Sequence, residues 1–191
     1  VPWQEGGTLS VAIGQGYDLT TPLQMALVAA SVGNGGTRYR PLILDRVETM
    51  EGEVVHQNLP QVAGKIPASP RTLSIVQQGL WGAVNGERGT GSRARLKDIE
   101  VAGKTGTSQV VGRKEGGDDY LHPHHRPHAW FVCYAPAGSP RIAVAVLIEN
   151  GEHGASAAGP IAREMVKTYL RTATGGPKAA AEDVRVLAGN G

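Results

Sequence analysis

The chain has 191 residues, enough for one domain with a buried core, and its 19 basic and 17 acidic side chains leave a net charge of +2. This balance gives no electrostatic footprint for nucleic acid, which we therefore exclude as a partner. One cysteine rules out an internal disulfide, and no apolar run reaches membrane-spanning length.

The N-terminal segment is predicted to be a loop, because residues 1–8 are polar and contain glycine. A short apolar run, residues 9–13, then ends at Gly14-Gln15-Gly16. This glycine pair does not match a dinucleotide-binding fingerprint, since the third glycine is replaced by Leu19. Nucleotide binding through this motif is therefore not expected.

The next element is predicted to be a helix that begins at Pro22, is capped by Thr20 or Thr21, and stops at the glycines of residues 33–36. One face of it is expected to pack closely because it carries small and apolar residues, namely Leu23, Ala26, Leu27, Ala30 and Ser31. We interpret this helix as structural support.

The middle of the chain is predicted to form a hairpin, a linker and a second helix. The hairpin covers residues 42–57 with its turn at Glu51-Gly52, and the linker covers residues 60–70. Apolar residues then recur three and four apart up to Asn85, which is typical of a helix capped near Ser69. Trp81 lies on the apolar face and is expected in the core. Residues 86–93 are expected to form a solvated, glycine-rich connection.

The stretch from residue 101 to residue 111 is the strongest chemical signal. Its valines favour a strand, whereas Gly103 and Gly106 weaken one and indicate close approach by a ligand or another backbone. Thr105 and Thr107 are two residues apart, so their hydroxyls share one face, and Lys104 points to the other. At the rim of a cleft, this ammonium, these hydroxyls and the amides around Gly106 would capture an anion.

Two motifs compete for Gly103-Lys104-Thr105. A P-loop needs a glycine five residues earlier, where the chain has Asp98, and the loop between carries two carboxylates. It could not cradle phosphates. The alternative is the K-T-G element of penicillin-interacting serine enzymes.

A polar loop follows and is rich in metal-ligand types. It spans residues 113–126, and His122, His124 and His125 lie in it with His128 just beyond. Prolines flank these histidines and forbid the helix that an i, i+4 pair needs, so we predict no metal site and no cofactor. A zinc site remains the alternative, which equilibrium dialysis would test.

The last elements are predicted to be two strands and a helix. The strands cover residues 129–135 and 141–149, and the second is apolar on both faces, which is typical of a central strand. Its alanine face leaves room for a helix that we predict over about residues 160–171. Residues 173–191 show no core pattern and are expected to be a disordered tail.

Four segments together resemble the class B penicillin-binding proteins, and within them penicillin-binding protein 2. Beside K-T-G these are Gly14-Gln15-Gly16-Tyr17 with the following Thr21-Pro22-Leu23-Gln24-Met25-Ala26, then residues 128–136, and residues 142–151. The resemblance implies an α/β fold of the α+β type, in which an antiparallel sheet is covered by helices, as in the penicillin-binding protein and β-lactamase-like transpeptidases. Residues 1–172 would be the C-terminal portion of that domain.

The resemblance also implies roles and partners. Lys104 and Thr107 would be catalytic, and Thr105, Gly106 and Thr107 would bind the carboxylate of a D-Ala-D-Ala stem peptide or a β-lactam antibiotic. The parent protein would be anchored in the cytoplasmic membrane, with this domain periplasmic and a membrane glycosyltransferase of cell elongation as its partner. The chain begins at Val1 rather than methionine, so we expect a piece of that parent.

Two of the three catalytic elements of this family are absent from the sequence. No serine is followed by lysine at the third position, as in S-x-x-K, or by asparagine at the second, as in S-x-N. We therefore expect a transpeptidase fragment that is inactive alone. The alternatives are a non-catalytic module that binds carboxylates or peptides, and a zinc-binding interaction domain that uses the histidine-rich loop.

Overall fold

The computed structural model describes residue 3 and residues 5–16, 18–110 and 122–174. Its centre is an antiparallel sheet of three strands in the order β5-β6-β7, which are Ala102–Ser108, His128–Ala135 and Ile142–Ile148. The pairing runs from Ala102 opposite Tyr134 to Ser108 opposite His128. The predicted α+β class and the consecutive order of these three strands are thereby confirmed.

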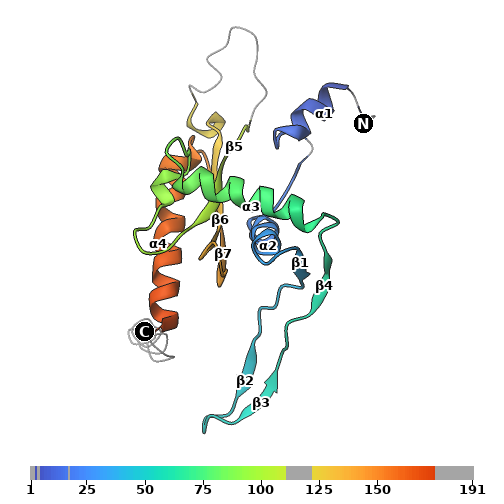
Figure 1. Ribbon diagram of the computed structural model, residues 1–191, viewed down its shortest axis with the longest axis vertical. Helices are drawn as coiled ribbons and strands as arrows, with labels where there is room; N and C mark the ends of the chain where they lie inside the picture. Colours follow the sequence, from blue (N-terminus) through green and yellow to red (C-terminus); the bar gives the residue numbers. More distant parts are fainter. Residues whose placement is uncertain (1–2, 4, 17, 111–121, 175–191) are drawn as a thin grey trace.

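Helices cover both faces of the sheet (Figure 1). Helix α4, Gly154–Thr174, packs on the face of Phe131 and Val144, and helix α2, Pro22–Gly33, packs on the other face, where Gly33 meets the ring of Tyr134. Both faces of β7 are covered, as predicted. Its alanine face, however, packs against α2 and not against α4, the helix predicted to cover it. The predicted central position was also wrong, since β7 is an edge strand of this three-stranded sheet.

Helix α3, Pro70–Asn85, connects the two sides of the structure. Near its middle, the side chain of Gln77 donates to the Val32 carbonyl at the end of α2, and at its far end Val84 is fully buried in the α4-side core. Trp81 is 40% exposed, so its predicted place in the core was wrong. Helix α3 thus runs beside β5 and contacts both the α2 side and the α4 side of the core.

The caps of α2 and α3 follow the predicted chemistry. The hydroxyl of Thr21 accepts from the Gln24 amide while the Gln24 side chain accepts from the Thr21 amide, which is a capping box. Ser69 caps α3 through the Thr72 amide. The predicted packing face of α2 was only partly correct. Ser31 is buried as predicted, but Ala29, which was not predicted, is also buried, and Leu23, which was predicted to pack, is 57% exposed.

Two small ladders project from the core (Figure 1). Strands β2, Arg46–Glu48, and β3, Val54–Gln57, form the predicted hairpin with Gly52 at φ 88° in its turn. Strands β1, Thr37–Tyr39, and β4, Val62–Lys65, pair between that hairpin and the core (Figure 1). The linker predicted over residues 60–70 was therefore wrong where β4 forms.

The two ends of the chain also differ from expectation. Helix α1, Glu5–Ala12, replaces part of the predicted N-terminal loop, and the indole of Trp3 donates to the Thr8 hydroxyl across its first turn. Helix α4 begins at Gly154, before the predicted start, and contains Pro160. Its last residue is Thr174, and the rest of the predicted tail lies outside the described residues. Within the described part of the chain, no helix combines the length and apolarity of a membrane span.

The outer surface of α4 carries an apolar stripe. Ile161, Met165 and Tyr169 are 43%, 48% and 43% exposed and line an open groove of about 870 Å³ with Ile142. The groove lies beside the edge strand β7. It is remote from the polar residues of β5.

Candidate functional site at the free edge of β5

Strand β5 brings the predicted site residues to an edge of the described sheet. Only one of its sides pairs with a strand, β6, so alternate residues direct their backbone groups outward. Strand β6 lies so close to Gly103 and Gly106 that it leaves little room for a side chain at either position. A Cβ atom at Gly103 would lie 2.7 Å from the Cys133 Cβ atom, and one at Gly106 would lie 3.0 Å from the Trp130 Cβ atom. The close approach predicted at these glycines is therefore made by the neighbouring strand.

Lys104 and Thr105 are in contact, although their backbone positions face opposite sides. The Lys104 ammonium folds back and donates to the Thr105 carbonyl at 2.7 Å and to its hydroxyl at 3.3 Å. The Thr90 hydroxyl lies 3.4 Å from the Thr105 hydroxyl and supports it from the loop after α3. An ammonium has three donors, so a positive charge with hydrogen-bonding capacity stands at an exposed strand edge.

Thr107 lies farther along the edge and is exposed. Its carbonyl accepts from Nε2 of Gln15 at 2.9 Å, and the next outward amide, that of Gln109, donates to Oε1 of Gln15 at 3.2 Å. Gln15 was not predicted as a site residue and appeared only in a rejected dinucleotide motif and in the family resemblance. The contact spans 92 residues, so no local pattern could reveal it.

A cavity of about 490 Å³ opens beside Thr107. One wall is formed by Gln15, Thr107 and Gln109, and the opposite wall by Arg126, Pro127, Glu152 and His153. The site therefore combines a strand edge, a cationic side chain and a hollow. This arrangement suits an extended ligand with an anionic end.

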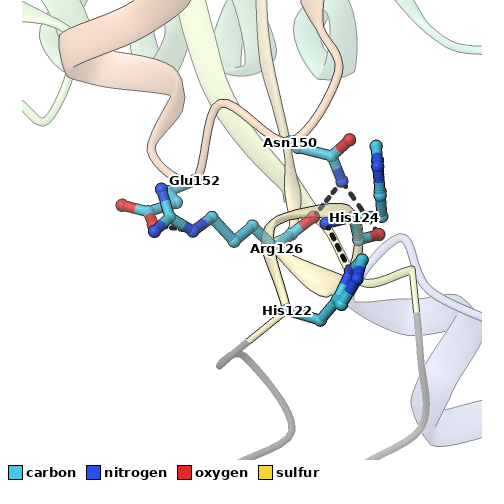
Figure 2. Close-up of polar contacts among 5 residues, drawn as sticks. All are labelled: His122, His124, Arg126, Asn150 and Glu152. Atoms are coloured by element: carbon cyan, nitrogen blue, oxygen red, sulfur yellow. Dashed lines mark hydrogen bonds and ion pairs between the residues drawn. The ribbon is translucent and has the colours of Figure 1, made fainter.

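The opposite wall is held together by a polar network (Figure 2). Arg126 pairs with Glu152 at 3.2 Å, and the Asn150 amide nitrogen donates to the carbonyls of His124 and Arg126 at 3.1 and 2.8 Å. Asn150 and Glu152 have φ of 55° and 63°, a left-handed conformation that costs about 1–3 kcal/mol outside glycine. Neither residue was predicted as part of the site.

The histidine-rich segment contributes backbone rather than ligands to this wall. The ring of His122 lies 5.2 Å from the rings of both His124 and His125. Among the residues that the structure describes, no three histidine, cysteine or acidic side chains are grouped so as to hold a metal ion. Residues 113–121 of the same predicted loop lie outside the described residues, as does Val111 at the end of the predicted strand stretch.

Cys133 lies under the site on β6, where it is 1% exposed, and burial raises the pKa of its thiol to about 12. Because the thiolate is the reactive form, we expect iodoacetamide at about pH 8 to leave the folded chain unmodified and to add one group after denaturation. Intact mass measurement distinguishes the two states. Rapid alkylation of the folded chain would show instead that β6 opens readily.

Comparisons with known proteins match most of the chain. A family described as the penicillin binding protein transpeptidase domain matches residues 2–167. A peptidoglycan D,D-transpeptidase, MrdA, of Haemophilus influenzae is 36% identical over 88% of the chain, and one of Mycolicibacterium smegmatis, PbpA, is 32% identical over 84%. The match covers 26% and 31% of these relatives, so the chain spans about a quarter to a third of their length.

Solved structures give the same result for the fold. Penicillin-binding protein 2B of Streptococcus pneumoniae superposes with a TM-score of 0.71 at 28% identity, over 90% of this chain and 28% of that one. PBP2 of Pseudomonas aeruginosa, solved in complex with WCK 5153, gives 0.67 at 35% identity, over 88% of this chain and 34% of that one. A third similar structure is the complex of PBP2 with MreC from Helicobacter pylori, at 0.66 and 26% identity, over 90% of this chain and 29% of that one.

Proposed function

Because this chain belongs to the penicillin-binding protein transpeptidase family and is similar to penicillin-binding protein 2, we propose that it is the C-terminal part of a peptidoglycan D,D-transpeptidase domain. The parent enzyme would cross-link stem peptides by serine acyl transfer and would bind penicillin. The observation that carries this proposal is the position of Lys104, Thr105 and Thr107 along a strand edge that pairs with no other strand of the described sheet, with a cavity beside Thr107.

The site residues would divide the work by their chemistry. The hydroxyls of Thr105 and Thr107 would bind the terminal carboxylate of a D-Ala-D-Ala peptide or of a β-lactam. Lys104 would supply positive charge near that carboxylate and a hydrogen bond to the serine of S-x-N. The outward N–H of Thr107 would be one half of an oxyanion hole, where removing a donor typically costs about 2.7–4 kcal/mol of barrier. Gly106 would contribute only backbone groups to ligand binding, because Trp130 of β6 occupies the space beside its Cα atom.

This chain alone would not perform the reaction. None of its serines begins an S-x-x-K or S-x-N element, so neither the nucleophile nor its base is present in the sequence. The other half of the oxyanion hole would come with that nucleophile. We therefore assign to this chain carboxylate recognition and half of the oxyanion stabilisation.

The parent would act outside the cytoplasm, on an N-terminal anchor in the cytoplasmic membrane and with a membrane glycosyltransferase of cell elongation as its partner. Family membership supports this setting, and the Helicobacter pylori PBP2 solved with MreC shows that a relative assembles with another protein.

The decisive measurement is intact mass after incubation with benzylpenicillin. We expect no adduct on this chain, and one stoichiometric adduct on the parent protein that carries S-x-x-K. An adduct on the chain alone would overturn its inactivity, because a nucleophile would then exist among its own residues. An unlabelled parent protein would overturn the transpeptidase assignment.

A non-catalytic module that binds carboxylates is the second candidate, because the anion-binding groups are assembled here without a nucleophile. Calorimetry of the chain with a D-Ala-D-Ala peptide separates it from the fragment. Binding weaker than the millimolar range would discard the module.

A further inference from the structure

We propose that Gln15 is a positioning residue of this site, whose side-chain amide holds the end of β5 so that Thr107 meets the ligand in a fixed orientation. This inference rests on the proposed function for the identity of the ligand. The contact itself, two hydrogen bonds between one side chain and the outer edge of β5, is independent of it.

The turn that carries Gln15 is built to present its side chain. Gly14 and Gly16 on either side have φ of 73° and 74°, which residues other than glycine rarely adopt. The backbone N–H of Gln15 donates to the Ser10 carbonyl at 2.9 Å. A Cβ atom at Gly16 would lie 3.2 Å from the Ser10 Cβ atom. The glycines that form no dinucleotide site thus fold a tight turn after α1 that aims Gln15 at β5.

The end of β5 needs such a partner. Its pairing with β6 ends at Ser108 opposite His128, so Gln109 lies beyond the ladder. A carboxamide offers one acceptor and a donor group, the same pair that a peptide of a neighbouring strand offers. The side chain of Gln15 therefore makes the two hydrogen bonds, to the Thr107 carbonyl and from the Gln109 amide, that a neighbouring strand would make at this end of β5.

The two bonds fix the peptide groups on both sides of Ser108. The Nε2 bond orients the carbonyl of Thr107, and the Oε1 bond orients the amide of Gln109. Gln15 also lines the cavity, but both polar atoms of its side chain bond to β5, so we expect it to act through Thr107. The consequence is that part of the loss on removing Gln15 should depend on the Thr107 hydroxyl.

The first test is amide hydrogen exchange of the chain, followed by NMR. Gln15→Met keeps the length of the side chain but removes both bonds, so the Gln109 amide should exchange about threefold to tenfold faster. Gln15→Glu keeps the acceptor and should retain that protection. The control is Gln78→Met, since Gln78 is an exposed glutamine on α3 that bonds only locally, to Ser74. An unchanged exchange rate of the Gln109 amide in Gln15→Met would overturn the proposal that Gln15 holds the end of β5.

The second test is the acylation rate of the full-length parent protein with benzylpenicillin. Gln15→Met and Gln15→Glu should both slow it about threefold to tenfold, and the loss from Gln15→Met should be smaller in a Thr107→Val background, which lacks the hydroxyl but keeps the backbone N–H of Thr107. Equal losses in both backgrounds, or an unaffected Gln15→Glu, would overturn the positioning role. A wild-type parent that is not acylated would overturn the proposed function, while faster Gln109 exchange would still establish that Gln15 holds the end of β5.

Discussion

Replacing Gly154 with alanine is expected to destabilise the protein by about 3 kcal/mol or more and to lower Tm by roughly 6–12 °C. Gly154 is the first residue of α4 and is buried against the site strand. A Cβ atom there would collide with the Trp130 carbonyl and lie 2.6 Å from the Gly106 carbonyl oxygen. These neighbours are backbone atoms, which cannot rotate away as a flexible side chain can.

The matched control is Gly79→Ala in α3. A Cβ atom at Gly79 would have no atom within 4 Å, and the position is helical. Alanine should therefore stabilise the helix by about 0.4–1 kcal/mol. Thermal unfolding followed by circular dichroism measures both variants. If Gly154→Ala unfolded at the wild-type temperature, the start of α4 would have to be free to move away from Gly106.

The helices and the main sheet were largely predictable because their signals are local. Thr21, Gln24 and Pro22 form a capping pattern within four residues, and the structure contains that capping box. The apolar strands at residues 128–135 and 142–148 are joined by a short connection, which favours antiparallel pairing. In these cases the residues that determine the element are near neighbours in the chain.

Other features depend on the environment that tertiary packing creates. The two apolar faces of β7 indicated correctly that both are covered, but such a pattern cannot distinguish a central strand from an edge strand between two helices. Trp81 lies on an apolar helical face and is nevertheless 40% exposed, because α3 runs beside β5. Periodicity shows which face is apolar and leaves open how much of it a neighbour covers.

The candidate site was predicted only as far as its motif extends. Lys104, Thr105, Gly106 and Thr107 lie on β5 as expected, but the contact between Lys104 and Thr105 depends on a long side chain that folds back across the strand edge. Gln15 reaches the site from 92 residues away. The part of the cavity formed by Arg126 and Glu152 depends on the left-handed backbone of Asn150, a conformation that no sequence pattern predicted.

Replacing Lys104 with alanine is expected to slow benzylpenicillin acylation of the full-length parent protein by roughly tenfold to 150-fold, if that protein is the transpeptidase we propose. The reason is the loss of a charge-assisted hydrogen bond, which contributes about 1.5–3 kcal/mol. Lys104 is exposed, so the free energy of unfolding should change by less than about 0.5 kcal/mol. The rate would be followed by mass spectrometry.

Two companion variants make the Lys104 experiment specific. Lys97→Ala removes an exposed lysine just before β5, so it controls for net charge and should leave the rate unchanged. Lys104→Arg keeps the positive charge but replaces a compact ammonium with a planar fork, which cannot donate to the Thr105 carbonyl and hydroxyl in the same geometry. A rate between wild type and Lys104→Ala is therefore expected for Lys104→Arg. A wild-type rate in Lys104→Ala would remove Lys104 from the mechanism, and a wild-type rate in Lys104→Arg alone would show that charge matters rather than the position of the donor.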